Sequence, residues 1–406
     1  MRSVLEIAAP IERTARASTG RAPLLAFVAD AETERVIRDN LGDLGVADAA
    51  IIRGGITKAI DVLGTQRSPD LLIVDITGDD LPVSRVHSLA EVCEPGVTVV
   101  AIGDRNEIGL YRDLLHAGIS DYIVKPLTAQ LVARVLTGQT HPGEVGTIHR
   151  RVGTMVAVVG ARGGVGTTTI AVNLAWYLAN QQNRRVALLD LDLHNGNCAM
   201  ALNVKATPGL REALVSPTRI DNTLLDRVMA PVGERLFVLS AEEPLRDSVD
   251  FTADAVETLV GALREQFHYV VVDVPRTPSA PFLRALDMAD FRIVVADETL
   301  RSARDTVRLR DALGEGEGQQ HRNLLVVNRD GEGGRHAITL DEMQHILELR
   351  PKSVIPFQPA VFGAAASGAA VAAAQRGKFR DAIAALAFEL SGRAAEPRRR
   401  RWWSTK

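Results

Sequence analysis

The chain has 406 residues and a formal net charge of −3, with 46% hydrophobic and 24% charged residues. This composition is typical of a globular protein of two or three domains, and the charge argues against nonspecific DNA binding by the bulk surface. No apolar run approaches the ~18 residues that span a bilayer, and no signal-peptide core follows Met1, so we expect a cytoplasmic protein. Its two cysteines, Cys93 and Cys198, indicate small core residues in a reducing compartment.

Residues 1–22 lack a clear hydrophobic period, which predicts a mobile N-terminal segment. In residues 23–136, short apolar runs alternate with helical patterns. The expected strands are 24–28, 50–52, 71–76, 97–102 and 122–124, and the expected helices are 32–43, 56–66, 81–92, 107–117 and 128–136. This alternation predicts a doubly wound α/β domain whose parallel sheet is covered on both faces.

Three residues of this domain stand at predicted strand ends, where ligands of such sheets bind: Asp30, Asp75 and Lys125. With the segment 117–127 they make residues 23–136 resemble a two-component receiver domain, which has a flavodoxin-like fold. The resemblance implies that Asp75 accepts a phosphoryl group, that Asp30 is a Mg²⁺ ligand, and that Lys125 pairs with the phosphoryl group.

Two positions depart from the receiver pattern. Ala29 replaces one of the paired acids after the first strand, and Gly103 replaces the hydroxyl residue after the fourth. The missing carboxylate should weaken Mg²⁺ binding, and the missing hydroxyl removes the contact that senses phosphorylation. We therefore expect a degenerate receiver that serves docking or dimerisation. A response regulator that signals through Asp75 remains an alternative.

Residues 137–152 are rich in Gly and polar groups and are predicted to be a linker. A second domain, residues 153–392, begins with an apolar strand, a glycine-rich turn and a helix. Gly163, Gly164 and Gly166 let the backbone adopt positive φ and approach a ligand, so that N–H groups can point at an anion. The helix N-terminus at Thr167 and Thr169 adds unpaired N–H groups, and this order therefore predicts a phosphate site.

The common phosphate loop reads Gly, four residues, Gly, Lys, then Ser or Thr. Here Ala161 stands at the first glycine and Thr167 at the lysine, which leaves Thr168 as the hydroxyl expected on Mg²⁺. Residues 162–169 nevertheless resemble the deviant Walker A loop of the MinD/ParA ATPases with both lysines replaced. The resemblance implies ATP as the ligand, held by Gly163, Gly164, Val165, Gly166, Thr167, Thr168 and Thr169. The alternative is a glycine-rich turn that binds nothing.

Two further apolar strands end in acids. Residues 186–189 precede Asp190 and Asp192, and residues 269–272 precede Asp273. Alternate residues of a strand point to the same side, so Asp190 and Asp192 can both face the loop. By resemblance Asp192 belongs to the first switch and Asp273 to the Walker B strand, where both would help Thr168 to hold Mg²⁺. Each acid taken alone is equally well explained as a cap or turn residue.

The strand 324–327 runs into Asn328 and Arg329, which resembles the adenine-contacting segment of the same family. An Asn amide can both donate to and accept from a base edge. Pro356 lies in an apolar segment that resembles the family's wall against the base.

The domain order resembles that of the CpaE/TadZ family of Flp (type IVb, tight-adherence) pilus assembly proteins. This resemblance implies an ATP-binding homodimer that localises the pilus secretion ATPase or other assembly components, often at a cell pole, with no nucleic acid as partner. A ParA-type DNA segregation ATPase is the alternative. Beyond a last domain helix at 379–390, residues 393–406 are predicted to be a basic, Trp-containing tail. In this tail, Arg398–Trp403 suggests peripheral contact with the inner membrane. A solvated tail or a peptide that docks on a partner explains this segment equally well.

The loop also bears on hydrolysis. Thr167 carries no charge to stabilise the γ-phosphate, whereas in the resembled family the residue at the position of Arg162 reaches the partner's phosphates. We interpret Arg162, Asp192 and Asp273 as the residues nearest to catalysis. The sequence predicts at most a weak ATPase, whose nucleotide chiefly joins two subunits.

Overall fold

The computed structural model describes residues 21–43, 49–136, 152–313, 322–334, 337–360, 363 and 372–391. The chain forms two compact units, Met1–Leu89 with Val97–Val145, and Ala90–Gly96 with Gly146–Lys406. Apart from residues 21, 22 and 152, the predicted N-terminal segment and linker lie outside the described residues, and so does the predicted basic tail. Within the described residues, no helix is both long and apolar enough to cross a membrane.

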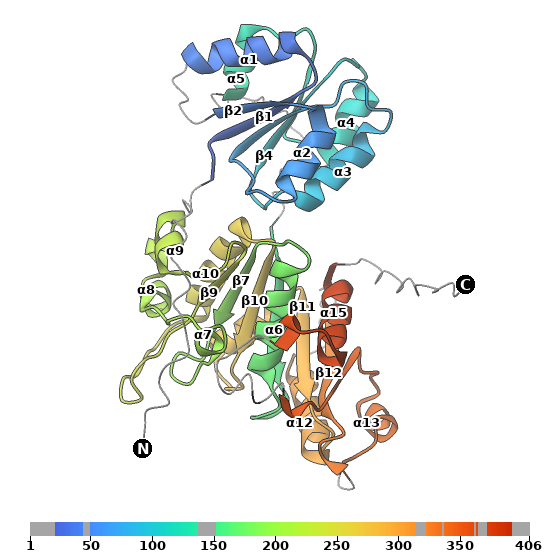
Figure 1. The fold of residues 1–406 in the computed structure, drawn as a ribbon. Coiled ribbons are helices and arrows are strands. Elements are labelled where there is room, and N and C mark those ends of the chain that lie inside the picture. The colour runs from blue at the N-terminus through green and yellow to red at the C-terminus, as the bar shows by residue number, and fades with distance from the viewer. Residues whose placement is uncertain are drawn as a thin grey trace, which may run out of the picture. The chain divides into compact units, whose positions relative to one another are not determined.

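The first unit contains a five-stranded parallel sheet (Figure 1). Its strand order is β2-β1-β3-β4-β5, which is the flavodoxin-like doubly wound order. The strands are β1 (Leu24–Val28), β2 (Ala49–Arg53), β3 (Leu71–Asp75), β4 (Thr98–Gly103) and β5 (Asp121–Val124). The helices are α1 (Ala31–Asp43), α2 (Gly55–Leu63), α3 (Pro82–Val92), α4 (Ile108–His116) and α5 (Ala129–Leu136).

Each predicted strand and helix of this unit is present. The largest shift is at the end of α2, which stops at Leu63 rather than at residue 66. One core is formed where α1 and α5 pack on the sheet through Ile37, Leu41, Val132 and Val135, and α2, α3 and α4 lie on the other face (Figure 1). The sheet is covered on both faces, which explains why its strands are almost continuously apolar.

The second unit is built on an eight-stranded sheet of order β13-β12-β11-β6-β10-β7-β9-β8. The strands are β6 (Thr154–Gly160), β7 (Val186–Asp190), β8 (Ala230–Val232), β9 (Leu236–Leu239), β10 (Tyr269–Val274), β11 (Phe291–Ala296), β12 (Arg322–Asp330) and β13 (Ser353–Pro356). The pairs are parallel except β8 with β9. The predicted α/β fold with a mostly parallel sheet is confirmed.

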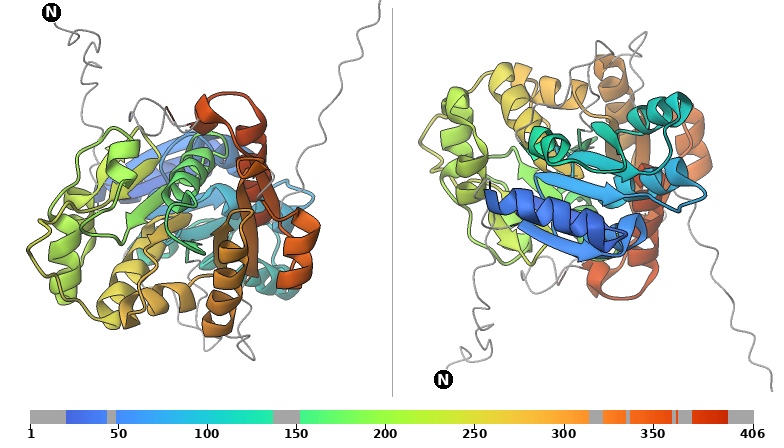
Figure 2. Two further views of the ribbon diagram at one scale, coloured as in Figure 1. Left: turned by 90° about the horizontal axis from the view of Figure 1, so that it is seen from below. Right: turned by 90° about the horizontal axis from the view of Figure 1, so that it is seen from above.

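Helices cover both faces of this sheet (Figure 2). One core contains residues of α6 (Thr167–Asn180), α7 (Cys198–Ala201) and α15 (Lys378–Ser391). The other contains residues of α8 (Gly209–Val215), α9 (Asn222–Val228), α10 (Ala253–Gln266), α11 (Ala280–Asp287) and α13 (Leu340–Leu347), with α12 (Leu300–Leu313) packed beside it. Every residue of the central strand β10 is buried. Because β7, β10, β6 and β11 are neighbours and run parallel, their carboxyl ends meet at one edge of the sheet. The loops at this edge carry the polar residues.

Candidate functional site

The glycine-rich loop joins β6 to α6 in a conformation that requires glycine. Gly164 has φ +81° and Gly166 φ +92°, values that strain other residues. A Cβ added at Gly163 or Gly164 would meet nothing within 4 Å, so the loop is open there. Among the described residues, the backbone N–H groups of residues 163–168 donate to no protein acceptor. The loop therefore offers a row of unused donors suited to an anion.

The start of α6 adds to this row. Gly166 is the N-cap and provides no side chain to satisfy the first-turn N–H groups. Val165 and Ile170 are fully buried and anchor the loop and the helix. The tight position at the strand end is Gly160, where an added Cβ would lie 2.5 Å from the Thr167 hydroxyl. Ala161, the next residue, is fully buried. The departure at Ala161 therefore leaves the loop intact.

Two predicted metal ligands meet beside the loop. Thr168 Oγ1 donates to Asp273 Oδ2 over 2.6 Å. Asp192 is engaged separately, because its carboxylate accepts the N–H of Asn195 at 2.9 Å while its own N–H donates to Asp190 Oδ1 at 3.1 Å. The Asp192 carboxylate thus makes the hydrogen bond expected of a cap or turn residue. Its role toward a metal stays a prediction.

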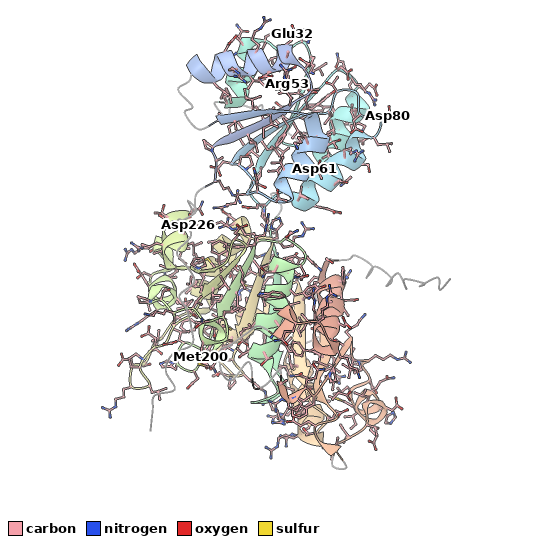
Figure 3. All side chains as sticks on the ribbon, viewed as in Figure 1. Glu32, Arg53, Asp61, Asp80, Met200 and Asp226 are labelled. Carbon is pink, nitrogen blue, oxygen red and sulfur yellow. The ribbon has the colours of Figure 1, made fainter. Side chains whose placement is uncertain are left out.

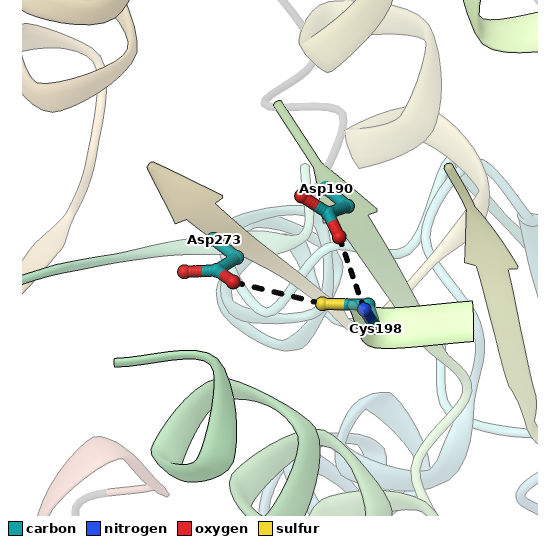
Figure 4. A group of neighbouring side chains, drawn as sticks. All are labelled: Asp190, Cys198 and Asp273. Carbon is teal, nitrogen blue, oxygen red and sulfur yellow. Dashed lines mark hydrogen bonds between the residues drawn. The ribbon is translucent and has the colours of Figure 1, made fainter. Parts of the chain in front are cut away.

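Sequence reasoning missed two neighbours of Asp273. The side-chain ligand atoms of Asp190, Cys198 and Asp273 lie within 4.8 Å of one another, and all three residues are buried (Figure 4). Asp190 Oδ2 accepts the Cys198 N–H at 3.1 Å, and the thiol donates to Asp273 Oδ2 at 3.7 Å. Met200, two residues further along α7, is 52% exposed (Figure 3). Cys198 is a core residue as predicted, but its thiol faces two acids.

The carboxyl groups of Asp190 and Asp273 would place negative charge in a buried site. Burial raises the pKa of Asp273 to about 7, and the charge of Asp190 adds to the rise. Burial likewise raises the pKa of Asp190, and that of the Cys198 thiol well above its usual range. A divalent cation would neutralise these carboxylates. Carboxylate and hydroxyl oxygens suit Mg²⁺, so Asp273 and Thr168 fit this ion, whereas a protonated thiol does not.

The loop arginine is bound within its own chain. The Arg162 guanidinium makes a short ion pair with Asp297 Oδ2, and its Nε lies 3.4 Å from Asp297 Oδ1. Its Nη1 also donates to the carbonyl of Gly163 at 3.0 Å. The predicted reach of Arg162 to a second subunit therefore requires that this pair open.

Asn328, the predicted base reader, holds the loop itself. Its Nδ2 donates to the carbonyl of Val165 at 2.8 Å, and a Cβ at Gly166 would lie 2.4 Å from this nitrogen. Asn328 is 1% exposed, and its Oδ1 has no partner among the described residues. The acceptor oxygen and the second N–H of the amide are therefore not used by the loop. Arg329 has φ +64° and pairs with Glu332, and Pro356 ends β13 half-buried.

The three residues predicted in the first unit lie together. Lys125 Nζ is 2.5 Å from Asp30 Oδ2 and 2.7 Å from Asp75 Oδ2. The buried Asp75 carboxylate also accepts the N–H groups of Ala29 and Thr77, each at 3.0 Å. Burial opposes ionisation of Asp30, but the hydrogen bond from Lys125 lowers the pKa of Asp30 to about 2. An acid–lysine cluster thus stands at the carboxyl edge of this sheet.

Gly103 lies against the side chain of Tyr122. A Cβ at this position would lie 2.4 Å from the hydroxyl oxygen of Tyr122. Tyr122 is buried, and its hydroxyl donates to the carbonyl of Arg105 at 2.9 Å. The tyrosine therefore occupies the space that a hydroxyl side chain at residue 103 would need.

Comparison with known proteins places the second unit. Residues 151–292 match the ParA family, described as NUBPL iron-transfer P-loop NTPase. The septum site-determining protein MinD of Synechocystis sp. is 27% identical over 157 residues, which are 38% of this chain and 57% of that protein. Three MinD relatives are matched over 57%, 62% and 65% of their own lengths, less than two thirds in each case. Residues 151–292 of the second unit are therefore similar to the ParA/MinD P-loop NTPases.

A solved structure agrees on the fold. MinD of Pyrococcus horikoshii OT3, complexed with Mg-ADP, aligns with a TM-score of 0.50 and 20% identity over 58% of this chain and 95% of its own. The pilus assembly protein CpaE of Caulobacter crescentus CB15 is 34% identical over 29% of this chain and 91% of its own, with a TM-score of 0.27.

Proposed function

We propose that this protein is an ATP- and Mg²⁺-binding homodimer that localises or assembles a Flp (tight-adherence) pilus secretion machinery. The observation that carries the nucleotide part is the open loop at residues 163–168, whose unused N–H groups adjoin the Thr168–Asp273 pair. Amides, a helix N-terminus and a hydroxyl–carboxylate pair are what a nucleotide with its Mg²⁺ requires.

The residues present fit this ligand. The loop amides and the α6 terminus would hold phosphates, Thr168 and Asp273 would hold Mg²⁺ with Asp192, and the unpartnered Oδ1 of Asn328 would accept from the base. Arg329 and Pro356 would line the base side. Bound ATP would supply the γ-phosphate, and Mg²⁺ would neutralise its charge. The chain itself would orient this group, while Thr167 adds no cation, so we infer weak or absent hydrolysis.

The proposal of a pilus role rests on domain order. A five-stranded flavodoxin-like unit with an incomplete receiver site precedes a P-loop unit with an atypical loop, the order that the CpaE/TadZ resemblance implies. In this proposal the first unit docks or dimerises, and the second binds nucleotide beside the pilus secretion ATPase or another assembly component. The cytoplasmic face of the inner membrane at a cell pole is the proposed location.

One observation favours the ParA-type alternative. Arg301, Arg304 and Arg308 are exposed along one face of α12. Arg304 and Arg308 share the carboxylate of Asp305, which reduces the charge that this face offers to DNA. We expect no duplex DNA binding tighter than ~10⁻⁴ M at physiological salt. Micromolar binding that weakens steeply with salt would favour the segregation function instead.

Nucleotide binding is tested by calorimetric titration of the full chain with Mg-ATP and Mg-ADP. We expect a saturable isotherm that is lost when Thr168 is replaced by Ala, because the hydroxyl on Mg²⁺ is removed. Thr258→Ala, at an exposed position of α10 outside the predicted site, is the matched control and should keep binding. If neither nucleotide binds at millimolar concentration, the proposal is wrong.

The incomplete receiver makes a second prediction. A small phosphodonor with Mg²⁺ should leave no stable aspartyl-phosphate on Asp75, because its buried carboxylate is occupied by Lys125 and two backbone donors. Intact-mass measurement checks this. A stable adduct that disappears in Asp75→Asn would show that the unit is a working receiver.

The basic tail, which lies outside the described residues, is proposed to contact anionic lipid. Deleting Arg398–Lys406 should reduce co-sedimentation with vesicles of anionic lipid, since each Arg near such a surface contributes ~1 kcal/mol. The melting temperature should not change. Co-sedimentation that survives the deletion would remove the membrane contact from the proposal.

A further inference from the structure

The ion pair of Arg162 with Asp297 joins the phosphate loop to the end of a neighbouring strand. Asp297 directly follows β11, and β11 pairs with β6, the strand that leads into the loop. The N–H of Ala161 donates to the carbonyl of Val295 at 2.8 Å, so the two strand ends are fixed side by side. Arg162 is the single Lys or Arg in residues 160–169. The cationic side chain of the loop is therefore ion-paired with a carboxylate of its own chain.

Asp297 is the fixed partner of this pair. Its carboxylate accepts the Thr299 hydroxyl at 2.7 Å, and its N–H donates to the Ser302 hydroxyl at 3.0 Å. Its side chain is 10% exposed, against 30% for Arg162. Arg162 has the longer and more exposed side chain, so opening of the pair moves the arginine and leaves the carboxylate in place.

We infer that Asp297 is a positioning residue that acts through Arg162. Without nucleotide, it holds the guanidinium at the strand edge; with nucleotide, the phosphates take the guanidinium from it. Carboxylates and phosphates bind the same planar fork of N–H donors, so they compete for it. The inference rests on the proposed function, because it takes ATP as the ligand. Asp297 then sets how much nucleotide is needed to free the loop's cation.

The opposite end of β11 carries a pair that serves as a control. Asp290 directly precedes the strand, and the Nη2 atom of Arg264 lies 3.2 Å and 2.9 Å from its two carboxylate oxygens. This pair ties the amino end of the sheet, away from the loop. Loss of stability that follows from breaking any Arg–Asp pair next to β11 should also appear in Asp290→Asn. A change in nucleotide affinity should not appear in this variant.

The test compares wild type, Asp297→Asn, Arg162→Ala, the double variant and Asp290→Asn as full chains. Melting without nucleotide and calorimetric titration with Mg-ATP are measured for each. Asp297→Asn should melt about 2–4 °C lower and bind Mg-ATP roughly fivefold to tenfold tighter. A change in opposite directions is not expected of a residue that only supports the fold. Asp290→Asn should melt lower with unchanged affinity.

The Arg162→Ala background decides the mechanism. There, Asp297→Asn should change the Mg-ATP affinity less than about twofold, because the residue through which it acts is gone. An equal gain in that background would mean that Asp297 merely repels phosphate, and would overturn the inference. Unchanged or weaker binding by the single Asp297→Asn variant, while wild type binds, would overturn it too. If wild type binds no Mg-ATP, the proposed function fails first.

Discussion

Replacing Asp273 by Asn is expected to stabilise the nucleotide-free protein at neutral pH and to abolish Mg²⁺-dependent nucleotide binding. Burial and the nearby charge of Asp190 raise the pKa of Asp273 to about 7, whereas an unfolded chain has an Asp pKa of about 3.9. Between these values the folded protein binds more protons than the unfolded one. The free energy of unfolding therefore falls as pH rises from about 4 to about 7, by up to ~1.4 kcal/mol per unit.

Asparagine resembles the protonated acid, so the variant should lose most of this slope and be more stable than wild type at pH 7 and above. Chemical unfolding at several pH values measures the slope, and titration with Mg-ATP measures binding. Asp192→Asn is the matched control, because its carboxylate lies outside the buried group and the slope should persist. A slope that survives Asp273→Asn would show that another group carries it.

Replacing Thr167 by Lys is expected to raise ATP turnover by at least about tenfold, since removal of one donor to a developing oxyanion commonly costs 10²-fold or more. Thr167 is half-buried at the start of α6, where a lysine would add the missing charge. Thr167→Gln has similar length without charge and should leave turnover low. Steady-state ATPase assays compare the three proteins.

Wild-type turnover should lie well below the ~1 s⁻¹ low end of ordinary enzymes. Arg162→Ala should in addition reduce the dimer formed with nucleotide, measured by sedimentation, if the guanidinium reaches a second subunit. Brisk turnover by wild type would contradict the proposal that the nucleotide is chiefly a bond between subunits.

The sequence predicted the elements well where apolar periodicity and strand-end chemistry are local. The five strands and helices of the first unit follow from such runs, and the Thr168–Asp273 pair follows from two motifs at strand ends. Asn328 was predicted to contact the base, but one N–H of its amide donates to the carbonyl of Val165 in the loop. Neither residue propensity nor a sequence motif determines which hydrogen-bond partner a side-chain amide takes.

The remaining features depend on register between distant strands. Asp190 stands opposite Asp273 because β7 pairs with β10 in that register, and the thiol of Cys198 completes the group only because α7 turns back over both strands. The partner of Arg162 likewise comes from 135 residues away. No local pattern in the sequence indicates such a pairing, so the contact of Asp190 with the Asp273 group and that of Asp297 with Arg162 were not predicted.

The packing of Tyr122 on Gly103 has a consequence for how this domain can change over generations. A Thr introduced at residue 103 alone meets the tyrosine hydroxyl, and overpacking of this kind costs about 1–3 kcal/mol. A smaller residue at position 122 alone loses a buried ring and its hydrogen bond to Arg105 without restoring a hydroxyl. Either substitution alone therefore lowers the stability of the fold. A hydroxyl side chain at residue 103 therefore requires two coordinated substitutions, at residues 103 and 122.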